Sequence, residues 1–452
     1  MKKNDYFRGE CVDMSHDGKG IVKYDGFTYF VDGMIIGEIG KIKVIKMLKR
    51  YGLGRLLELT STSEYRINPK CHVFQGCGGC NLQHLTNEGQ KFFKTKRVKD
   101  CLERIGHCSA PVNECLMDNS PFYYRNKVQM PVGYDKNGSI VAGFYKQRTN
   151  DIVACSDCLI QNKESNKLIQ RCIELMNEYD IKPYDKIKHL GNIKHILTKK
   201  GNSTDEVMLC FIIYQDTIKD IDKITKTLLK EFPNIKTIIL NINKRHDNVI
   251  LGDKEKIVYG AGYIYDYLLD NKYQISLKSF YQINPVQVEH LYQTAIDFAN
   301  LNKDDVVLDA HCGIGTISLS LAKYVKKVYG VEIVKEAIDD ANINANLNDI
   351  NNVEFVCDDA GKYMIKLLED GVKLDVVFVD PPRKGCSKEF LEYLVKANPK
   401  KLVYISCDVA TQARDIDILQ NEGYHVEKVQ PVDMFPQTSH VENAILLKSS
   451  KK

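Results

Sequence analysis

The feature that most constrains the fold is a regular alternation of apolar strands and amphipathic helices from about residue 270 onward. Helices separate the first six predicted strands, whereas only residues 434–440 join the sixth strand to the seventh. A parallel pair needs a crossover of roughly a dozen residues or more, so the seventh strand is predicted to run antiparallel. The predicted strands are residues 306–310, 327–332, 353–357, 374–380, 402–406, 425–432 and 442–447.

This pattern predicts a doubly wound α/β sheet with one antiparallel strand, which is typical of class I S-adenosylmethionine-dependent methyltransferases and differs from the all-parallel dinucleotide dehydrogenase sheet. Residues 61–265 show a mixed α+β pattern that does not reveal a function. In residues 1–60, short alternating runs are separated by Asp25-Gly26 and Asp32-Gly33, which predicts hairpins and a small OB-like barrel that binds nucleic acid. We therefore expect three domains, at residues 1–60, 61–265 and 266–452.

Composition indicates a soluble globular protein with more than one domain, since 452 residues contain 44% apolar and 27% charged side chains. No apolar run approaches the roughly 20 residues of a membrane span, and Met1–Asp5 does not resemble a signal peptide. We expect a cytoplasmic protein without a membrane partner. In a reducing compartment the 15 cysteines would be metal ligands, catalytic groups or small core residues rather than a disulfide scaffold.

Local charge is more informative than the net charge of +4. Residues 41–58 carry six lysines and arginines against one acid, and residues 91–99 carry five, interleaved with Phe92 and Phe93. Either run alone is equally well explained as a solvated face. Two such runs beside a cysteine cluster favour RNA as the partner.

A nucleoside-cofactor loop is predicted where the first strand of the α/β region ends, at Asp309–Gly315. Gly313 and Gly315 allow the backbone to approach a ligand closely, although Ser318 stands where a third glycine would complete a pyrophosphate fingerprint. Glu332 ends the second strand, where a carboxylate can accept both hydrogen bonds of a ribose diol.

Two further acidic positions are expected at the same edge of the sheet. Asp358 and Asp359 end the third strand, where an adenine amino group would lie. Asp380-Pro381-Pro382-Arg383 ends the fourth strand, beside the cofactor. An aromatic residue usually follows this motif in methyltransferases that act on exocyclic amines, so Arg383 argues against amine methylation.

Cys407, directly after the fifth strand, is the candidate nucleophile. The amino end of the predicted helix 410–419 would lower its thiol pKa, and Cys386 is the rival. A thiolate that adds to C6 of uracil makes C5 nucleophilic, and a base must then remove the C5 proton. Glu442 and His440 are the candidate bases.

A cysteine cluster at Cys71, Cys77 and Cys80 provides three thiols within ten residues, with glycines that allow tight wrapping. A fourth ligand is needed for zinc or for an iron–sulfur cube, and Cys155 and Cys158 are the candidates. The spacing predicts a metal site and leaves the metal open.

Together these residues resemble the RNA uracil-5-methyltransferase family, in particular its 23S ribosomal RNA branch, over nearly the whole chain. The specific matches are Ser406-Cys407-Asp408 with Ala413-Arg414-Asp415 downstream, and His440-Val441-Glu442-Asn443. The resemblance implies that Cys407 is the nucleophile, that Glu442 is the base, and that RNA, most specifically 23S rRNA, is the partner, with no DNA expected.

The resemblance also implies cofactors. The first 60 residues are similar to a TRAM domain, and Cys71, Cys77, Cys80 and Cys158 match the family's 4Fe-4S ligands. Gln282 matches a contact to S-adenosylmethionine, as do Glu332 and Asp380. His311 stands where the family usually has an aromatic residue, and we retain it with Asp359 as a cofactor contact. Zinc at the cysteines is the alternative.

Two other functions remain open. A cytosine-5 or amine methyltransferase would share the sheet, but the cytosine enzymes place their nucleophile in a Pro-Cys context that this chain lacks. An iron–sulfur RNA-binding factor with an inactive methyltransferase domain would bind RNA without turnover, and the presence of both a nucleophile and a base argues against it.

Overall fold

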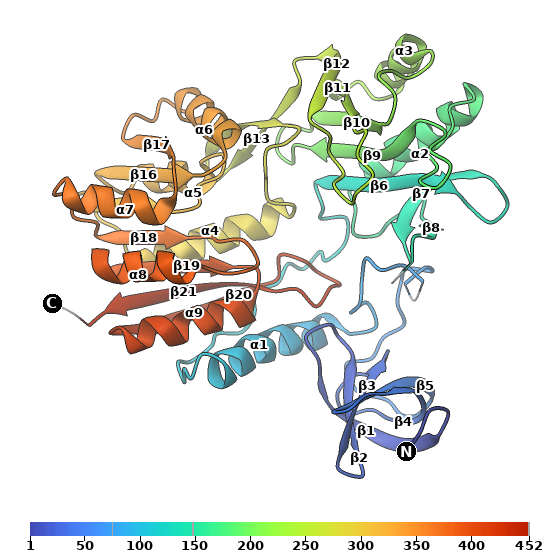
Figure 1. The fold of residues 1–452 in the computed structure, drawn as a ribbon, viewed down its shortest axis with the longest axis horizontal. Coiled ribbons are helices and arrows are strands. Elements are labelled where there is room, and N and C mark those ends of the chain that lie inside the picture. The colour runs from blue at the N-terminus through green and yellow to red at the C-terminus, as the bar shows by residue number, and fades with distance from the viewer. Residues whose placement is uncertain (75, 147–148, 451–452) are drawn as a thin grey trace.

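In the computed structural model, which describes residues 1–74, 76–146 and 149–450, the chain forms a closed barrel, two seven-stranded sheets and a separate two-stranded hairpin. Figure 1 shows the barrel at one end of the molecule and the two large sheets beyond it. None of the helices in this described part combines the length and the apolar character needed to cross a bilayer.

The N-terminal barrel follows from strict alternation along its strands, which join in the order β1-β2-β3-β5-β4. In β4, Ile42 and Val44 point into the barrel core while Lys41 lies outside, because successive side chains of a strand face opposite sides. The expected OB-like barrel is thereby confirmed. Its strands are β1 (Tyr6–Met14), β2 (Gly20–Tyr24), β3 (Phe27–Asp32), β4 (Ile39–Met47) and β5 (Gly52–Ser61).

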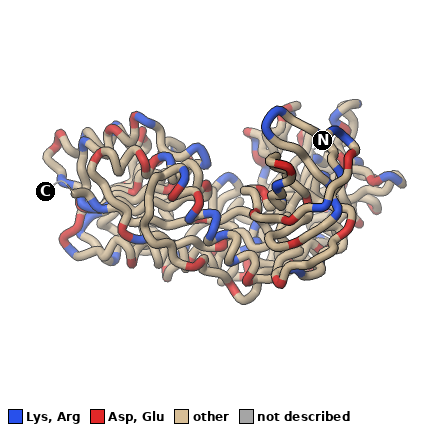
Figure 2. Tube along the Cα trace, turned by 90° about the horizontal axis from the view of Figure 1, so that it is seen from below, with Lys and Arg blue, Asp and Glu red and all other residues tan. Residues whose placement is uncertain are grey.

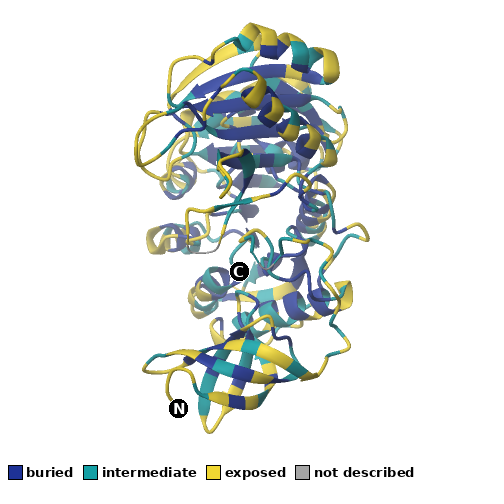
Figure 3. Ribbon diagram, turned by 90° about the vertical axis from the view of Figure 1, so that its right-hand side faces the viewer, coloured by how far each residue is buried: buried dark blue, intermediate teal, exposed yellow. Residues whose placement is uncertain are grey.

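The central sheet has the order β12-β11-β10-β9-β6-β7-β8. Every residue of β10 is buried, because alternate side chains pack against α2 and α3 on one face and against β13 and β14 on the other. Figure 3 shows these buried strands in dark blue and the exposed outer faces of the covering helices in yellow. The elements are β6 (Lys127–Tyr134), β7 (Ile140–Tyr145), β8 (Ile152–Ala154), α2 (Lys163–Glu178), β9 (Ile193–Lys200), β10 (Val207–Ile213), α3 (Ile221–Glu231), β11 (Ile235–Ile242), β12 (Lys254–Gly260), β13 (Tyr263–Leu268) and β14 (Asn271–Ser276).

The C-terminal sheet has the order β17-β16-β15-β18-β19-β21-β20. The strands from β15 to β19 run parallel, and β21 is antiparallel to both β19 and β20. The predicted methyltransferase-type sheet and its reversed seventh strand are confirmed. The elements are α4 (Pro285–Ala299), β15 (Val306–Asp309), α5 (Thr316–Ala322), β16 (Lys327–Glu332), α6 (Lys335–Leu347), β17 (Val353–Cys357), α7 (Ala360–Glu369), β18 (Val376–Val379), α8 (Lys388–Ala397), β19 (Lys401–Ser406), α9 (Val409–Asn421), β20 (Tyr424–Val432) and β21 (Glu442–Ser449).

Helix α1 (Asn87–Arg104) contains the second lysine-rich run, and it packs against α9 and β20 of the C-terminal sheet. Lys94 is fully buried and forms an ion pair with Asp433, while Lys96 pairs with Asp13 of the barrel at 3.0 Å. The helix thus turns Lys94 and Lys96 toward protein carboxylates, so these two lysines do not by themselves indicate an RNA-binding surface.

Candidate active site

The predicted site residues lie at one edge of the C-terminal sheet. Parallel strands end at a common edge, so the residues that follow β15, β16, β18 and β19 are neighbours. Strand β21 runs the other way and therefore begins there, with Asn443 opposite Ser406 and Glu442 opposite Val432. The residues assembled in this way are Asp309, Glu332, Asp380, Cys407 and Glu442.

The loop after β15 is shaped to receive a ligand. Gly313 has a φ of 53° and a Cβ there would meet nothing within 4 Å, so open space adjoins the backbone. Gly315 has a φ of 87° and is packed against the Phe355 ring, so a larger residue would clash. Ser318, which replaces the third glycine of the fingerprint, donates a hydrogen bond of 2.6 Å to Asp309 Oδ2.

Two buried polar atoms beside this loop have no hydrogen-bond partner in the described part of the chain, Asp309 Oδ1 and His311 Nδ1. Burial raises the pKa of Asp309 to about 6 and lowers the pKa of His311 to about 4. His311 is therefore a neutral ring at pH 7, and it lies 5.7 Å from the Phe390 ring. Unpaired buried polar atoms of this kind indicate a site for a polar ligand.

The other expected cofactor residues occupy the rim. Glu332 Oε1 accepts a hydrogen bond from the Val334 amide at 3.0 Å. Asp359 is exposed and caps α7 by accepting from the Lys362 amide at 3.0 Å, and its charge acts on His311. Gln282 is buried just before α4, and its carbonyl accepts from Asn126 at 3.0 Å.

Cys407 is half-buried and faces charged groups of both signs. Its pKa is raised to about 11, first by burial and then by Glu442 and Asp380, while Arg383 lowers it. On balance this pKa is raised, and the lowering expected from the amino end of α9 stays a prediction. Asp408 caps that helix by accepting from the Ala410 and Thr411 amides, both at 3.1 Å, and the two nearby carboxylates disfavour the thiolate.

Glu442 and His440 differ as bases. Glu442 is 3% exposed, and burial followed by Asp380 raises its pKa to about 8. Burial raises the pKa of Asp380 as well. Burial and nearby cations lower the pKa of His440 to about 4. Glu442 is thus a carboxyl group tuned to exchange a proton near neutral pH.

Cys386, the rival nucleophile, lies in the hydrophobic core beneath α8 and α9. Its amide donates to Asp415 Oδ2 at 2.8 Å, and burial raises its thiol pKa to about 12. Glu442 and Asp380 act on Cys407 and not on Cys386. The two candidate thiols therefore lie in different surroundings: Cys386 is in the hydrophobic core, whereas Cys407 is close to Glu442 and Asp380.

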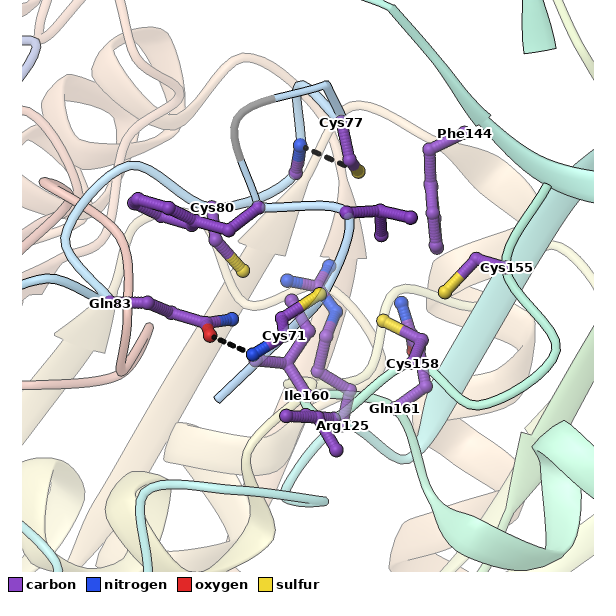
Figure 4. A pocket seen from close by; sticks show the side chains of 14 residues that line it. Cys71, Cys77, Cys80, Gln83, Arg125, Phe144, Cys155, Cys158, Ile160 and Gln161 are labelled. Atoms are coloured by element: carbon purple, nitrogen blue, oxygen red, sulfur yellow. Dashed lines mark hydrogen bonds between the residues drawn. The ribbon is translucent and has the colours of Figure 1, made fainter. Parts of the chain in front are cut away.

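A second site is formed by the cysteines of the central region. Cys71, Cys77, Cys80, Cys155 and Cys158 line one cavity of about 250 Å³. Figure 4 shows their sulfur atoms around this space and Arg125 reaching up into it. The Nε atom of Arg125 is buried without a hydrogen-bond partner among the described residues. Within residues 1–74, 76–146 and 149–450, no group of three or more His, Cys, Asp or Glu side chains could hold a metal ion.

Sequence reasoning missed Arg125 and gave Ser318 no role in these sites, although it placed Asp309 in the cofactor loop. Arg125 stands in an uninformative stretch 45 residues after Cys80, and only the folded chain brings it to the cavity. Ser318 carried a usable signal, because a hydroxyl nine residues after a buried aspartate, across a strand-to-helix turn, can reach back to it.

Comparison with known proteins gives one family and full-length relatives. Residues 93–450 match the tRNA (uracil-5-)-methyltransferase family model. An uncharacterized RNA methyltransferase of Oceanobacillus iheyensis is 45% identical over 98% of this chain and 96% of its own, and one of Halalkalibacterium halodurans is 44% identical over 99% and 98%. The crystal structure of Pyrococcus abyssi tRNA (uracil-54, C5)-methyltransferase in complex with S-adenosyl-L-homocysteine is 27% identical, with a TM-score of 0.77 over 97% of this chain and 99% of that one.

Proposed function

The chain belongs to the tRNA (uracil-5-)-methyltransferase family and is an S-adenosylmethionine-dependent RNA methyltransferase, and we propose that it methylates C5 of a specific uridine in 23S rRNA through Cys407 and Glu442. The observation that carries the proposed C5 chemistry is the convergence of Cys407, Glu442, Asp380 and Arg383 at one sheet edge. The choice of 23S rRNA rests on the sequence resemblance. A thiol and a buried carboxyl group in one crevice are the two groups that C5 methylation needs.

Covalent chemistry begins at Cys407. Its raised pKa means that the resting thiol is protonated near neutral pH, so the proton must pass to solvent as the uracil enters, and Arg383 is the cation that favours the thiolate. The Sγ–C6 bond then forms, and the displaced π electrons make C5 nucleophilic. When bound, S-adenosylmethionine would supply the methyl group to C5, its sulfonium S–CH3 bond would break, and S-adenosylhomocysteine would leave.

Glu442 completes the reaction. Its carboxylate removes the C5 proton, and the electrons of the C5–H bond re-form the C5–C6 double bond while the C6–Sγ bond breaks. The products are 5-methyluridine and free Cys407. The pKa of about 8 places Glu442 close to the range in which one carboxyl group both takes and releases a proton.

The cofactor would be held by Gln282, His311, Glu332, Asp359 and Asp380. The fit rests on the unpaired His311 Nδ1, the open backbone at Gly313, and the acidic rim after successive strands. Glu332 offers its carboxylate to a ribose diol and Asp359 offers its own to an amino group, while the neutral His311 ring packs on a ligand face.

The cysteine cavity fits an iron–sulfur cluster held by Cys71, Cys77, Cys80 and Cys158. A zinc ion needs its four ligands within roughly 2.3 Å of one point, whereas a cube carries each thiolate on a separate iron. A cavity of about 250 Å³ that also contains the Arg125 guanidinium suits a larger, anionic group. The group would act here as a scaffold that ties the segment around Cys71 and Cys80 to the central sheet.

RNA would approach over the barrel, which we assign as a TRAM domain. Lys41 and Lys43 each lie 5.7 Å from the ring of the exposed Tyr6. Lysines interleaved with an exposed aromatic ring can contact phosphates and stack on bases.

Transfer RNA is the second candidate substrate. The matched family model and the Pyrococcus abyssi enzyme are both named for tRNA. The two substrates are distinguished by incubating the protein with radiolabelled cofactor and equal amounts of either 23S rRNA or tRNA transcript. The methyl label incorporated into each RNA is then measured. We expect methylation of the ribosomal transcript, and labelling of tRNA alone would replace that assignment.

The chemical proposal is tested with RNA deuterated at uracil C5. Methyl incorporation should be matched by an equal release of deuterium, and Cys407→Ala should abolish both while Cys386→Ala retains them. A methylated product that keeps its deuterium would exclude the C5 mechanism, and full activity in Cys407→Ala would exclude the covalent adduct.

Cluster binding is tested with anaerobically prepared protein. Iron content and visible absorbance should be lost in Cys158→Ser and retained in Cys155→Ser. The reverse outcome would move the fourth ligand to Cys155, and zinc without iron in the wild-type protein would select the alternative metal.

A further inference from the structure

The connection between β20 and β21 leads directly into Glu442, and we call residues 433–440 the Glu442 loop. Connections between strands normally run over the surface, yet Asp433 and Met434 are 0% exposed and Ser439 is 3% exposed. A buried loop must find partners for its backbone polar groups. For the backbone of Gln437 and Ser439, all of those partners come from a segment far away in the sequence, residues 81–97.

Asn81 holds the end of the loop nearest Glu442. Its Oδ1 accepts from the Ser439 amide at 2.7 Å and its Nδ2 donates to Ser439 Oγ at 2.9 Å. The amides of Asn81 and Leu82 both donate to the Gln437 carbonyl, at 3.1 and 3.0 Å. Asn81 is also the residue next to Cys80, so this contact joins the wall of the cysteine cavity to the Glu442 loop.

Helix α1 holds the rest of the loop. Gln90 Oε1 accepts from the Gln437 amide at 3.0 Å, and its Nε2 donates to Gln437 Oε1 at 3.2 Å. Arg97 donates to the Ser439 carbonyl. Lys94 pairs with Asp433 and donates to the Phe435 carbonyl at 3.2 Å.

The loop conformation depends on these contacts. Gln437 has a φ of 71°, in the left-handed region that a residue with a side chain rarely adopts. Such a residue keeps this conformation only when its surroundings fix it. Both the amide and the carbonyl of Gln437 are bonded by the segment 81–90, which supplies that restraint.

We propose that Asn81, Gln90 and Arg97 are positioning residues, which hold the Glu442 loop so that the Glu442 carboxylate reaches the C5 proton. This inference rests on the proposed role of Glu442 as the base. Cys407 belongs to a different part of the chain: it follows β19, which ends at Ser406, and α9 begins two residues later, at Val409. Loss of the Asn81 contacts should therefore slow proton removal and leave covalent addition intact.

Asn81→Ala tests the proposal with two RNA substrates. Turnover on ordinary RNA requires removal of the C5 proton, and misplacement by about 1 Å of a reacting group costs on the order of 100-fold. We expect kcat to fall about 10- to 100-fold with KM for RNA nearly unchanged. In RNA with 5-fluorouridine at the target, the C5–F bond does not break, so the Sγ–C6 adduct accumulates without the base. The rate of that trapping should stay within about twofold of wild type.

Asn81→Asp provides the conservative rescue. An aspartate still accepts from the Ser439 amide, and the Ser439 hydroxyl can turn to donate to it, whereas the bond from Asn81 Nδ2 to the Asp17 carbonyl at 2.9 Å is lost. Because the contacts to the Glu442 loop are kept, part of the lost turnover should return. Gln420→Ala is the matched control. It removes a hydrogen bond of 2.7 Å from α9 to the Gly106 carbonyl just after α1, which does not touch the loop, and turnover and trapping should both be unchanged.

Equal losses of turnover and trapping in Asn81→Ala, or no loss of either, would overturn the proposal, since a merely structural residue affects both steps together. Failure of the proposed function looks different. In that case the wild-type protein itself would release no deuterium and form no adduct with the fluorinated RNA.

Discussion

The two lysine-rich segments of this chain are both strongly basic, yet they lie in different environments. In the first, residues 41–58, Lys41, Lys46 and Lys49 are exposed on the barrel. In the second, residues 91–99, Lys94 is completely buried and Arg97 is bonded to the Glu442 loop. Figure 2 shows basic and acidic positions interspersed in both halves of the molecule, so charge density alone does not distinguish the two segments.

The difference follows from what each element packs against. A barrel strand has one face that always points outward, so its lysines stay in water. Helix α1 is wedged between the barrel and α9, and positions three or four residues apart share one face of it. Lys94 and Arg97 are three residues apart, so both turn toward the loop, whereas Lys99 points away. A basic run is therefore evidence for a nucleic-acid surface only after its packing is known.

Lys94→Ala should produce the largest effect, a loss of stability, and it tests most directly whether the second basic segment is buried. It leaves Asp433 buried without its partner, and such a change costs about 3–5 kcal/mol. Urea unfolding should show that loss. Lys94→Ala combined with Asp433→Ala should recover much of it, because no uncompensated charge then remains. A loss below about 1 kcal/mol in Lys94→Ala would mean that the pair is not buried in solution.

Replacing Lys41, Lys43 and Lys46 together by alanine should weaken RNA binding about tenfold and leave stability unchanged. Each phosphate contact contributes roughly 0.7 to 0.9 to the slope of log K against log salt, so filter binding at several salt concentrations should show a slope smaller by about 2. Lys219, Lys226 and Lys230, which are exposed around α3, form the matched triple variant. An equal loss in that control would show that the barrel has no special role.

Arg97→Gln should change the pH dependence of turnover, which the barrel variant should leave unchanged. Only the carboxylate form of Glu442 accepts a proton, so in the wild type the rise of kcat/KM with pH should become less steep near pH 8, where Glu442 is ionised. The Cys407 thiol, with its pKa of about 11, continues the rise above that pH. Burial is the main cause of the raised pKa. A loosened loop admits water and should move the inflection to lower pH. If Arg97→Gln and the barrel triple variant showed the same inflection pH, helix α1 would have no influence on the pKa of Glu442.

Lys99→Ala should have the smallest effect and sharpens the contrast within one helix. Its partner Glu103 is 3.8 Å away and both side chains are largely exposed, and exposed pairs contribute about 0–1 kcal/mol. The melting temperature and turnover should match the wild type. A clear loss of RNA affinity would instead restore a role in RNA binding to the exposed part of α1.

The C-terminal sheet was predictable because each of its strands is a short apolar run between helices, and the short link before Glu442 forces a reversal. The central sheet was less predictable. Strand β9 contains His195, Thr198 and Lys199, which make it resemble a surface segment, yet all three are buried. Lys199 is accommodated because its Nζ donates to the carbonyls of Ser276 and Ser279, both at 2.8 Å, and those partners lie in a distant part of the chain.

The candidate site likewise has features that the sequence could predict and features that it could not. Cys407, Glu442 and Asp380 could be named because each follows or begins a strand at the common edge. The direction of the Cys407 pKa could not be predicted, since it depends first on burial of the thiol and then on Glu442 and Asp380, which approach it from other strands. The residues that restrain the Glu442 loop gave no sequence signal, because Asn81 and Ser439 are 358 positions apart.

The amino-acid sequence by itself determined the alternation of strands and helices, the reversed last strand and the chemical types of the groups at the sheet edge, because periodicity and connection length act locally along the chain. Tertiary structure alone decided which lysines meet water, which thiol faces the crevice and what holds the loop before Glu442. Those outcomes depend on burial and on partners hundreds of residues away, and the free energy of a charge or a polar group is set by its surroundings.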